Sequence, residues 1–359
     1  MKKKILISTG GSGGHVIPAI ILYEHLKNNF ELFLSTDKRG TKFINNNIYN
    51  YKLIEITRVS KNIFKFPYFL FFFITSFFKS IYFIKKNNIE FLISTGGYMS
   101  LPLCLSAKFL NKKIILFEPN MVIGRSNKFF LKFSNKIICY SKNLINFPKE
   151  YKHKIFVISS LLRKKIYNQK KNLENKINKP FKILIIGGSQ GAGFFDNEIS
   201  DLMIDLFKIN KISLIQQITN EKKKKFLREK YNQLGIENEL FSFDEEIFQK
   251  YYQVDFAITR SGASTISELI FLNVPFLAMP LPKSKDNHQF YNAKDYYDKD
   301  LCWLLNQSEY NKENLKQFII NLIQNPNIYF EKKNNMNKFS YQNTWNNINQ
   351  KIMELINDN

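Results

Sequence analysis

The sequence predicts an α/β protein built from two Rossmann-like, doubly wound domains. Short apolar runs alternate with segments of helical spacing, which is typical of a parallel sheet covered by helices. The pattern starts twice, because residues 3–9 and 181–186 each run into a glycine-rich turn and then a helix. A chain of 359 residues is also long for a single core. We therefore expect two domains, separated near the Lys- and Asn-rich stretch 164–180.

The first half is expected to hold four strands, at residues 3–9, 30–35, 89–94 and 113–117. Turn-forming or polar residues directly follow three of them: Gly10–Gly14 with His15, Thr95–Tyr98, and Glu118–Asn120. Pro18 is expected to open the first helix, because proline is tolerated at a helix start.

The second half is expected to hold strands at residues 181–186, 255–259 and 275–279. The stretch Arg260–Asn292 is the densest in polar groups placed after strands, so we expect a ligand site there. Residues 341–356 have helical spacing and are expected to pack back on the first domain. The predicted domains are therefore residues 1–162 with 341–359, and residues 163–340.

Glu268 has two interpretations in the sequence. Thr265-Ile266-Ser267-Glu268 fits a capping box, in which the glutamate bonds back to the first amide of a helix. The Arg-Ser-Gly-Ala-Ser turn before it and His288, Gln289 and Asn292 after it favour a ligand-binding role instead.

Net charge and cysteine usage limit the class of protein. The formal charge is +23, from 53 Lys and Arg against 30 Asp and Glu, which suits nucleic acid, anionic membranes or phosphorylated substrates. Heavy use of Lys, Asn, Ile, Phe and Tyr also suggests A+T-rich codons, so part of this charge is expected to be compositional. The three cysteines are far apart and no metal-ligand spacing occurs, as in a reducing cytosol. The N-terminus has too short an apolar run for a signal peptide.

Residues 66–83 form a Phe-rich segment with lysines around it. Pro67 and Lys79 interrupt the run, which argues against a membrane-spanning helix. An interfacial helix on anionic lipid and a buried helix enriched in Phe by codon usage remain as alternatives.

The two glycine-rich turns are suited to phosphate binding at helix starts. Neither matches the dinucleotide pattern, and no Walker A motif occurs. Asp37, after the second strand, keeps an NAD-dependent dehydrogenase as an alternative. His15 is interpreted either as a helix-start histidine bonded to backbone or as a general base. No Asp-x-Asp metal motif occurs in a suitable place, so no metal cofactor is expected.

Several motifs taken together resemble the MurG family of GT-B glycosyltransferases. In the first domain they are GGSGGHVIPA (10–19), GGYMSLP (96–102) and EPNMVIGRSNK (118–128). In the second they are IGGSQGAG (186–193), TRSGASTISEL (259–269) and HQFYNA (288–293). The resemblance spans nearly the whole chain and implies a GT-B fold, with two domains that face a cleft.

The resemblance also implies an activity. It is an inverting transfer of N-acetylglucosamine (GlcNAc) from UDP-GlcNAc to the C4 hydroxyl of N-acetylmuramic acid in lipid I, which makes lipid II for peptidoglycan. The partners implied are UDP-GlcNAc, lipid I and, through residues 66–83, an anionic membrane surface. No cofactor and no nucleic acid are implied. The expected place is the cytoplasmic face of the bacterial inner membrane, as a peripheral protein.

The resemblance also implies roles for single residues, wherever this sequence matches a motif of the family. His15 is expected to act as the base, with hydrogen bonding to the lipid diphosphate as the alternative role. Acceptor or diphosphate contacts are expected from Ser12, Gly13, Gly14, Gly97 and Tyr98. Donor contacts are expected from Asn120, Arg163, Ser189, Gln190, Asp244, Ile247, Ala263, Ser264, Thr265, Glu268, His288 and Gln289. Pro119 and Ser159–Leu161 depart from the family pattern. The alternatives are a GT-B transferase acting on another glycolipid, and an inactive nucleotide- or anionic-lipid-binding protein.

Overall fold

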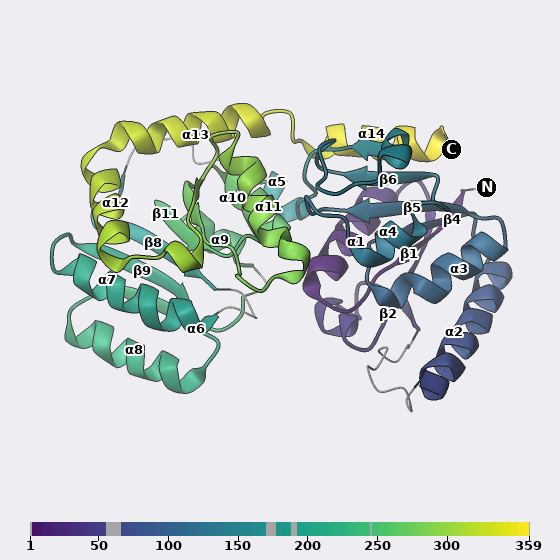
Figure 1. Cartoon of the computed structure of the whole chain (residues 1–359), viewed down its shortest axis with the longest axis horizontal. Helices are drawn as coiled ribbons and strands as arrows, with labels where there is room; N and C mark the ends of the chain where they lie inside the picture. Colours follow the sequence, from purple (N-terminus) through teal and green to yellow (C-terminus); the bar gives the residue numbers. More distant parts are fainter. Residues whose placement is uncertain (1, 55–65, 170–176, 188–191, 245, 359) are drawn as a thin grey trace. The chain divides into compact units, whose positions relative to one another are not determined.

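The computed structural model describes residues 2–54, 66–169, 177–187, 192–244 and 246–358. The chain forms two compact units (Figure 1). The first comprises Met1–Lys164 and Thr344–Asn359, and the second comprises Lys165–Asn343.

The first unit contains a seven-stranded parallel sheet in the order β3-β2-β1-β4-β5-β6-β7. Its central strands are apolar on both faces, since Ile5, Leu6 and Ile7 of β1 are fully buried. Three of the strands, β3, β6 and β7, were not predicted from the sequence. The bounds are β1 Lys4–Ser8, β2 Glu31–Thr36, β3 Tyr51–Leu53, β4 Phe91–Ser94, β5 Lys113–Glu118, β6 Lys136–Cys139 and β7 Ile155–Val157.

Helices cover this sheet, and the last helix of the chain belongs to the first unit. The ring of His25 stacks on that of Trp345 with centroids 3.5 Å apart. A hydrogen bond of 2.6 Å between His25 Nδ1 and Asn349 Oδ1 supports the same contact. The helices are α1 Gly13–Leu26, α2 Phe66–Lys86, α3 Leu101–Phe109, α4 Arg125–Phe130 and α14 Trp345–Asn357. The expectation that Pro18 opens the first helix is wrong, because α1 starts at Gly13 and Pro18 lies inside it.

The second unit contains a six-stranded parallel sheet in the order β10-β9-β8-β11-β12-β13. Both sheets therefore have the arrangement of a doubly wound fold, in which the chain starts at a central strand and moves outward in both directions. The bounds are β8 Phe181–Ile186, β9 Ile212–Gln217, β10 Asn238–Phe241, β11 Phe256–Thr259, β12 Phe276–Ala278 and β13 Trp303–Leu304.

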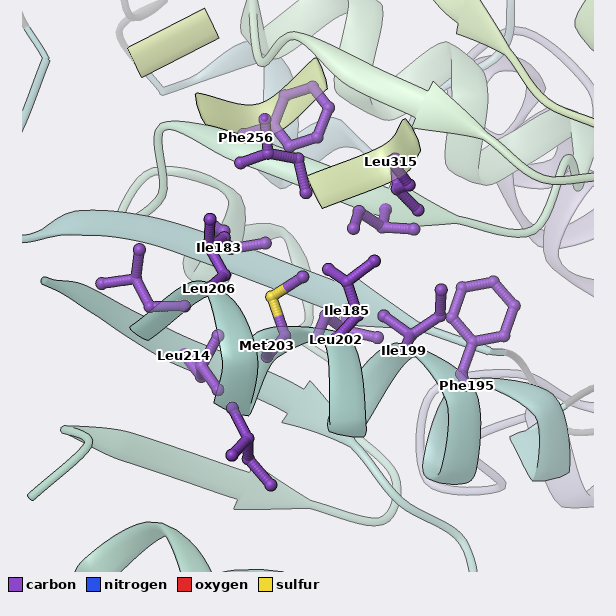
Figure 2. Close-up of a cluster of buried hydrophobic side chains, with 14 of the residues drawn as sticks. Ile183, Ile185, Phe195, Ile199, Leu202, Met203, Leu206, Leu214, Phe256 and Leu315 are labelled. Atoms are coloured by element: carbon purple, nitrogen blue, oxygen red, sulfur yellow. The ribbon is translucent and has the colours of Figure 1, made fainter. Parts of the chain in front are cut away.

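A core of aliphatic and aromatic side chains joins this sheet to α7 and α12. Figure 2 shows Ile183 and Ile185 of β8 with Leu202, Met203 and Leu206 of α7. All five of these side chains are completely buried. The helices are α5 Lys164–Tyr167, α6 Ala192–Phe194, a π-helical turn Phe195–Ile199, α7 Ser200–Phe207, α8 Glu221–Gln233, α9 Phe248–Tyr251, α10 Ala263–Leu272, α11 His288–Tyr297, α12 Lys312–Gln324 and α13 Pro326–Ser340.

The helix α2 is amphipathic and lies beside α3 (Figure 1). Its inner face carries Ser76, Ser80 and Ile84, all buried, and Ser106 Oγ of α3 donates to its backbone at 3.0 Å. The opposite face is exposed, with Phe71 63% and Phe78 62% accessible. The interpretation of α2 as a buried helix is therefore wrong. By length and composition alone, α2 is the one described helix that could cross a membrane.

Candidate functional sites

Each sheet has one switch point, where the order of strands reverses and ligands of α/β proteins bind. In the first unit it lies between β1 and β4, and in the second between β8 and β11. Both glycine-rich segments predicted from the sequence leave a strand at one of these points. Most of the expected site residues thus belong to two local sites, one in each unit.

His15 lies at the switch point of the first unit, in the first turn of α1. Its Nδ1 is 2.7 Å from the backbone oxygen of Thr95, which follows β4. A carbonyl oxygen only accepts, so Nδ1 carries the proton and the neutral ring keeps a lone pair on Nε2. The backbone contact expected of a helix-start histidine is present, but it uses only one ring nitrogen.

The turn after β4 lies against this imidazole. Gly96 and Gly97 have φ values of 89° and 82°, a conformation that favours glycine. A Cβ atom on Gly96 would be 3.4 Å from His15 Cε1, and one on Gly97 would be 3.8 Å from Nε2. Glycine at both positions keeps the space beside the imidazole open. The expected acceptor residue Gly97 is therefore close to His15.

Asp37 holds the first glycine-rich turn in place. Its Oδ1 accepts hydrogen bonds from the backbone N–H of Gly11 at 2.7 Å and of Gly40 at 3.0 Å. Its Oδ2 accepts from Arg39 Nε at 2.8 Å. This carboxylate is 7% exposed and serves the chain's own loops. The interpretation of Asp37 as the ribose-binding acid of an NAD site is therefore wrong.

Glu118, the last residue of β5, plays a similar part, and no role was assigned to it from the sequence. Its Oε1 accepts from Asn120 Nδ2 at 2.9 Å, and its Oε2 accepts from Gly124 N at 2.7 Å and Asn127 Nδ2 at 3.0 Å. Glu118 is 3% exposed. It therefore orients Asn120, one of the expected donor contacts. The sequence did offer one sign of this role, a glutamate placed directly after the apolar run 113–117.

In the second unit, α10 begins at Ala263, with Gly262 as its N-cap residue. Glu268 is then the sixth residue of the helix, too far along to bond back to the first amide. The capping-box interpretation is therefore wrong. Glu268 is 5% exposed. The expected donor residues Ala263, Ser264 and Thr265 form the first turn of α10, where backbone N–H groups point out of the helix end.

Gln289 connects the loops that follow β11 and β12. Its Oε1 accepts from the backbone N–H of Ser261 at 3.2 Å and of Leu281 at 3.0 Å. The amide oxygen therefore already accepts two hydrogen bonds from the protein backbone, and Nε2 is the end of the side chain that donates. Asn292 Nδ2 donates to the oxygen of Ser261 at 3.3 Å. His288 starts α11, and its Nδ1 is 2.8 Å from the oxygen of Lys285.

Arg260 fixes the same loops from inside. Its guanidinium donates through Nη1 to the backbone oxygens of Met279 and Pro280, at 3.1 and 3.0 Å, and through Nη2 to Gln307 at 2.7 Å. Its Cζ lies 4.6 Å from the ring centroid of Phe195. Burial lowers the pKa of Arg260 to about 10, so the side chain is still charged at neutral pH.

Three of the other expected donor residues, Asp244, Ile247 and Arg163, lie outside the loops that follow β11 and β12. Asp244 lies after β10, where its Oδ1 accepts from Glu246 N at 2.8 Å and its Oδ2 is 3.1 Å from Lys250 Nζ. Ile247 is half-buried at the start of α9, and Arg163 is half-buried before α5. Ser189 and Gln190 lie outside the described residues. Within the described chain, no three His, Cys, Asp or Glu side chains form a cluster that could hold a metal ion.

Comparison with known proteins identifies the family. Residues 5–139 match the glycosyltransferase family 28 N-terminal domain, and residues 182–348 match the glycosyltransferase family 28 C-terminal domain. The chain is 51% identical, over the full length of both, to the UDP-N-acetylglucosamine–N-acetylmuramyl-(pentapeptide) pyrophosphoryl-undecaprenol N-acetylglucosamine transferase of Pelagibacter ubique (strain HTCC1062). It is 36% identical to the protein of that name from Rickettsia felis (strain ATCC VR-1525 / URRWXCal2), with 94% of this chain and 95% of the relative covered.

The solved structure of MurG from Acinetobacter baumannii has the same fold. It superposes with a TM-score of 0.80 over 100% of both chains, at 20% identity. A structure of HepE from Anabaena in complex with UDP superposes with a TM-score of 0.64 at 11% identity, again over 100% of both chains. The predicted fold class, two Rossmann-like parallel-sheet domains of the GT-B type, is confirmed. With both domain models matched and a curated relative at 51% identity over its whole length, the chain belongs to the MurG family of glycosyltransferase family 28.

Proposed function

We propose that this chain transfers GlcNAc from UDP-GlcNAc to lipid I and so makes lipid II for peptidoglycan. The observation that carries the proposal is the 51% identity to the Pelagibacter transferase, with no part of either chain left unmatched. The predicted activity, a UDP-GlcNAc-dependent hexosyltransferase, agrees with the names of the relatives. The runner-up activity is a family 28 transfer to a different glycolipid.

His15 is proposed as the base of the transfer. Its Nε2 would take the proton from the acceptor C4 hydroxyl while that oxygen attacks the anomeric carbon of the donor sugar. The bond from that carbon to the UDP oxygen breaks, UDP leaves with the electron pair, and the anomeric configuration inverts. The hydrogen bond from Nδ1 to Thr95 supports this role because it selects the tautomer with a free lone pair on Nε2.

The second unit is proposed to bind UDP-GlcNAc. Glu268 would accept from the ribose hydroxyls, and the N–H groups of the first turn of α10 would face the diphosphate. Gln289 would use its Nε2 on the sugar, since its Oε1 already accepts from Ser261 and Leu281. Asn120, Arg163, Ser189, Gln190, Asp244, Ile247 and His288 remain proposed as the other donor contacts.

The first unit is proposed to bind lipid I and to rest on the cytoplasmic face of the membrane. A polyprenol chain stays in the bilayer, so the acceptor turns at Ser12–Gly14 and Gly97–Tyr98 must come near its surface. The exposed aromatic face of α2 and the exposed Lys79, Lys85 and Lys86 support an interfacial position. The association with a membrane follows from the lipid substrate of the relatives, and the leaflet and segment are our proposal.

The decisive experiment uses purified protein with UDP-GlcNAc and lipid I in detergent or vesicles. We expect UDP-dependent formation of lipid II, detected by mass spectrometry, and its loss in His15→Gln. Binding of UDP by the wild-type protein without turnover would overturn the enzymatic proposal in favour of an inactive nucleotide-binding protein. Turnover only with another glycolipid would support the runner-up.

A further inference from the structure

Arg39 lies beside the first glycine-rich turn, and no role has been assigned to it above beyond its contact with Asp37. It follows β2, the neighbour of β1 in the sheet, and so reaches the loop that leaves β1. A Cβ atom on Gly11 would be 3.4 Å from Arg39 Nη2. The guanidinium carbon is 5.1 Å from the ring centroid of Tyr98, which follows β4. Arg39 thus borders two of the expected acceptor turns at once.

The guanidinium is held in one orientation. Asp37 Oδ2 accepts from Arg39 Nε at 2.8 Å, while Oδ1 of the same carboxylate accepts from Gly11 N at 2.7 Å. Carboxylate, glycine-rich turn and arginine therefore form one connected unit. The ring of Tyr98 supports the guanidinium from another side by a cation–π contact. Fixing an arginine in advance lowers the entropy lost when it binds a ligand.

The contact with Asp37 uses only one of the five N–H donors. Within the part of the chain that the structure describes, the outer edge formed by Nη1 and Nη2 donates to no protein acceptor. The side chain is 36% exposed, so solvent or a ligand can reach it. Two parallel N–H donors at the edge of a guanidinium match two oxygens of one phosphate. A purely structural arginine would need only its Nε contact with Asp37.

The charge of Asp37 does not oppose an anion here. Its carboxylate accepts from two backbone N–H groups as well as from Arg39, so its negative charge faces three donors. The start of α1, a helix of 14 residues, lies in the same turn and is positive. The exposed Lys38 and Lys42 lie next to it in sequence. The potential around the outer edge of Arg39 therefore favours phosphate.

We propose that Arg39 binds the acceptor diphosphate, the group that joins the acceptor sugar to its polyprenol. This assignment rests on the proposed function, because the name of the relatives' acceptor supplies the pyrophosphoryl group. His15 leaves the same glycine-rich turn, so an acceptor whose sugar meets His15 presents its diphosphate near that turn. Arg39 is thus a specificity residue that distinguishes a diphosphate-linked acceptor from a less charged one.

The kinetic test varies lipid I at saturating UDP-GlcNAc. Arg39→Gln is expected to raise the KM for lipid I by about 10- to 100-fold, the usual effect of losing hydrogen bonds to a charged group. Its kcat and its KM for UDP-GlcNAc should stay within about twofold of wild type. Lys38→Gln is the matched control, since it removes an equal charge from the neighbouring exposed residue and should change neither constant. Arg39→Lys keeps the positive charge but lacks the two parallel N–H donors of the guanidinium. It should therefore show most of the increase in the KM for lipid I.

A binding test separates this assignment from the proposed function. Farnesyl diphosphate and farnesyl monophosphate are titrated calorimetrically into wild type, Arg39→Gln and Lys38→Gln, with melting curves as the check on folding. Wild type and Lys38→Gln should prefer the diphosphate by about tenfold or more, and Arg39→Gln should lose that preference. An unchanged preference and an unchanged acceptor KM in Arg39→Gln would overturn the role of Arg39 alone. If wild type makes no lipid II, the proposed function fails, and the titration still decides whether Arg39 binds diphosphate. If Arg39→Gln does not fold, Arg39→Lys is used in both tests with the same criteria.

Discussion

Replacing Phe71 and Phe78 by serine should release the protein from anionic membranes without unfolding it. Both rings lie on the outer face of α2 and are 63% and 62% exposed, so they contribute little to the folded core. A phenylalanine side chain can bury about 150–250 Å². Each ring therefore still has about 100–150 Å² of surface available for insertion into lipid.

That area sets the size of the effect. At about 25 cal/mol per Å², complete insertion of one ring would contribute about 3 kcal/mol. Insertion of half of both rings gives about the same total, and its loss would weaken vesicle binding by about 100-fold. Exposed lysines near the surface add about 1 kcal/mol each, a contribution that salt screens. Lys79, Lys85 and Lys86 are placed to supply it.

The assay is co-sedimentation with vesicles that contain anionic lipid, at low and at high salt. Phe226→Ser is the matched control, because Phe226 is 53% exposed on the Lys-rich helix α8 of the second unit. We expect the control to bind vesicles like wild type, and the double variant to melt like wild type but to remain in the supernatant. Equal sedimentation of all three proteins would refute the reasoning. So would a change from dimer to monomer in the double variant with vesicle binding unaltered, which would assign the face to a second copy of the chain.

Three further substitutions test the sites and the stability of the fold. His15→Gln should lower turnover at saturating lipid I by about 10²–10⁴-fold and remove the acidic limb of the pH–rate profile, and near-normal turnover would exclude the base role. Glu268→Gln should weaken UDP binding by about 10- to 100-fold in calorimetry, and unchanged affinity would assign Glu268 to packing. Burial lowers the pKa of His25 to about 4, against the opposing effect of its hydrogen bond to Asn349. Below about pH 6.5 the unfolded chain therefore binds a proton that the folded chain does not, so stability is lost as the pH falls from 6.5 to 4. Urea unfolding should show wild type losing about 3 kcal/mol more than His25→Gln across that range, and parallel curves would contradict this.

The sequence predicted the central strands well because they are the most strongly patterned elements. Residues 181–186 were assigned as a strand, and β8 has those bounds. The edge strands β3 and β13 have three and two residues, which is too short for any periodic signal. The contact between His25 and Trp345 joins residues 320 positions apart, and only the general return of the last helix was predictable from its spacing.

The start of α10 shows why sequence preferences for helix caps gave the wrong helix start at this site. The capping-box pattern Thr265-Ile266-Ser267-Glu268 suggested that the helix starts at Thr265. In the structure Gly262 has the extended backbone of an N-cap, with φ −67° and ψ 136°. β11 ends at Thr259 and α10 starts at Ala263, so only a short turn joins them. This turn places Gly262 at the N-cap position. Three residues that would have been outside the helix are instead its first turn.

Acidic residues after strands were the hardest to interpret, because ligand binding and loop support require the same residue type at the same place. Asp37 directly follows β2 and Glu118 is the last residue of β5, and each accepts several hydrogen bonds from its own chain. Several of their partners are backbone N–H groups, which every residue type except proline carries, so the sequence does not reveal them. A carboxylate of this kind reveals its role only when those amides are placed around it. The same contacts then point to the side chains that it orients, Arg39 beside Asp37 and Asn120 beside Glu118. Those two oriented side chains, and not the buried carboxylates, are the groups that we expect to meet substrate.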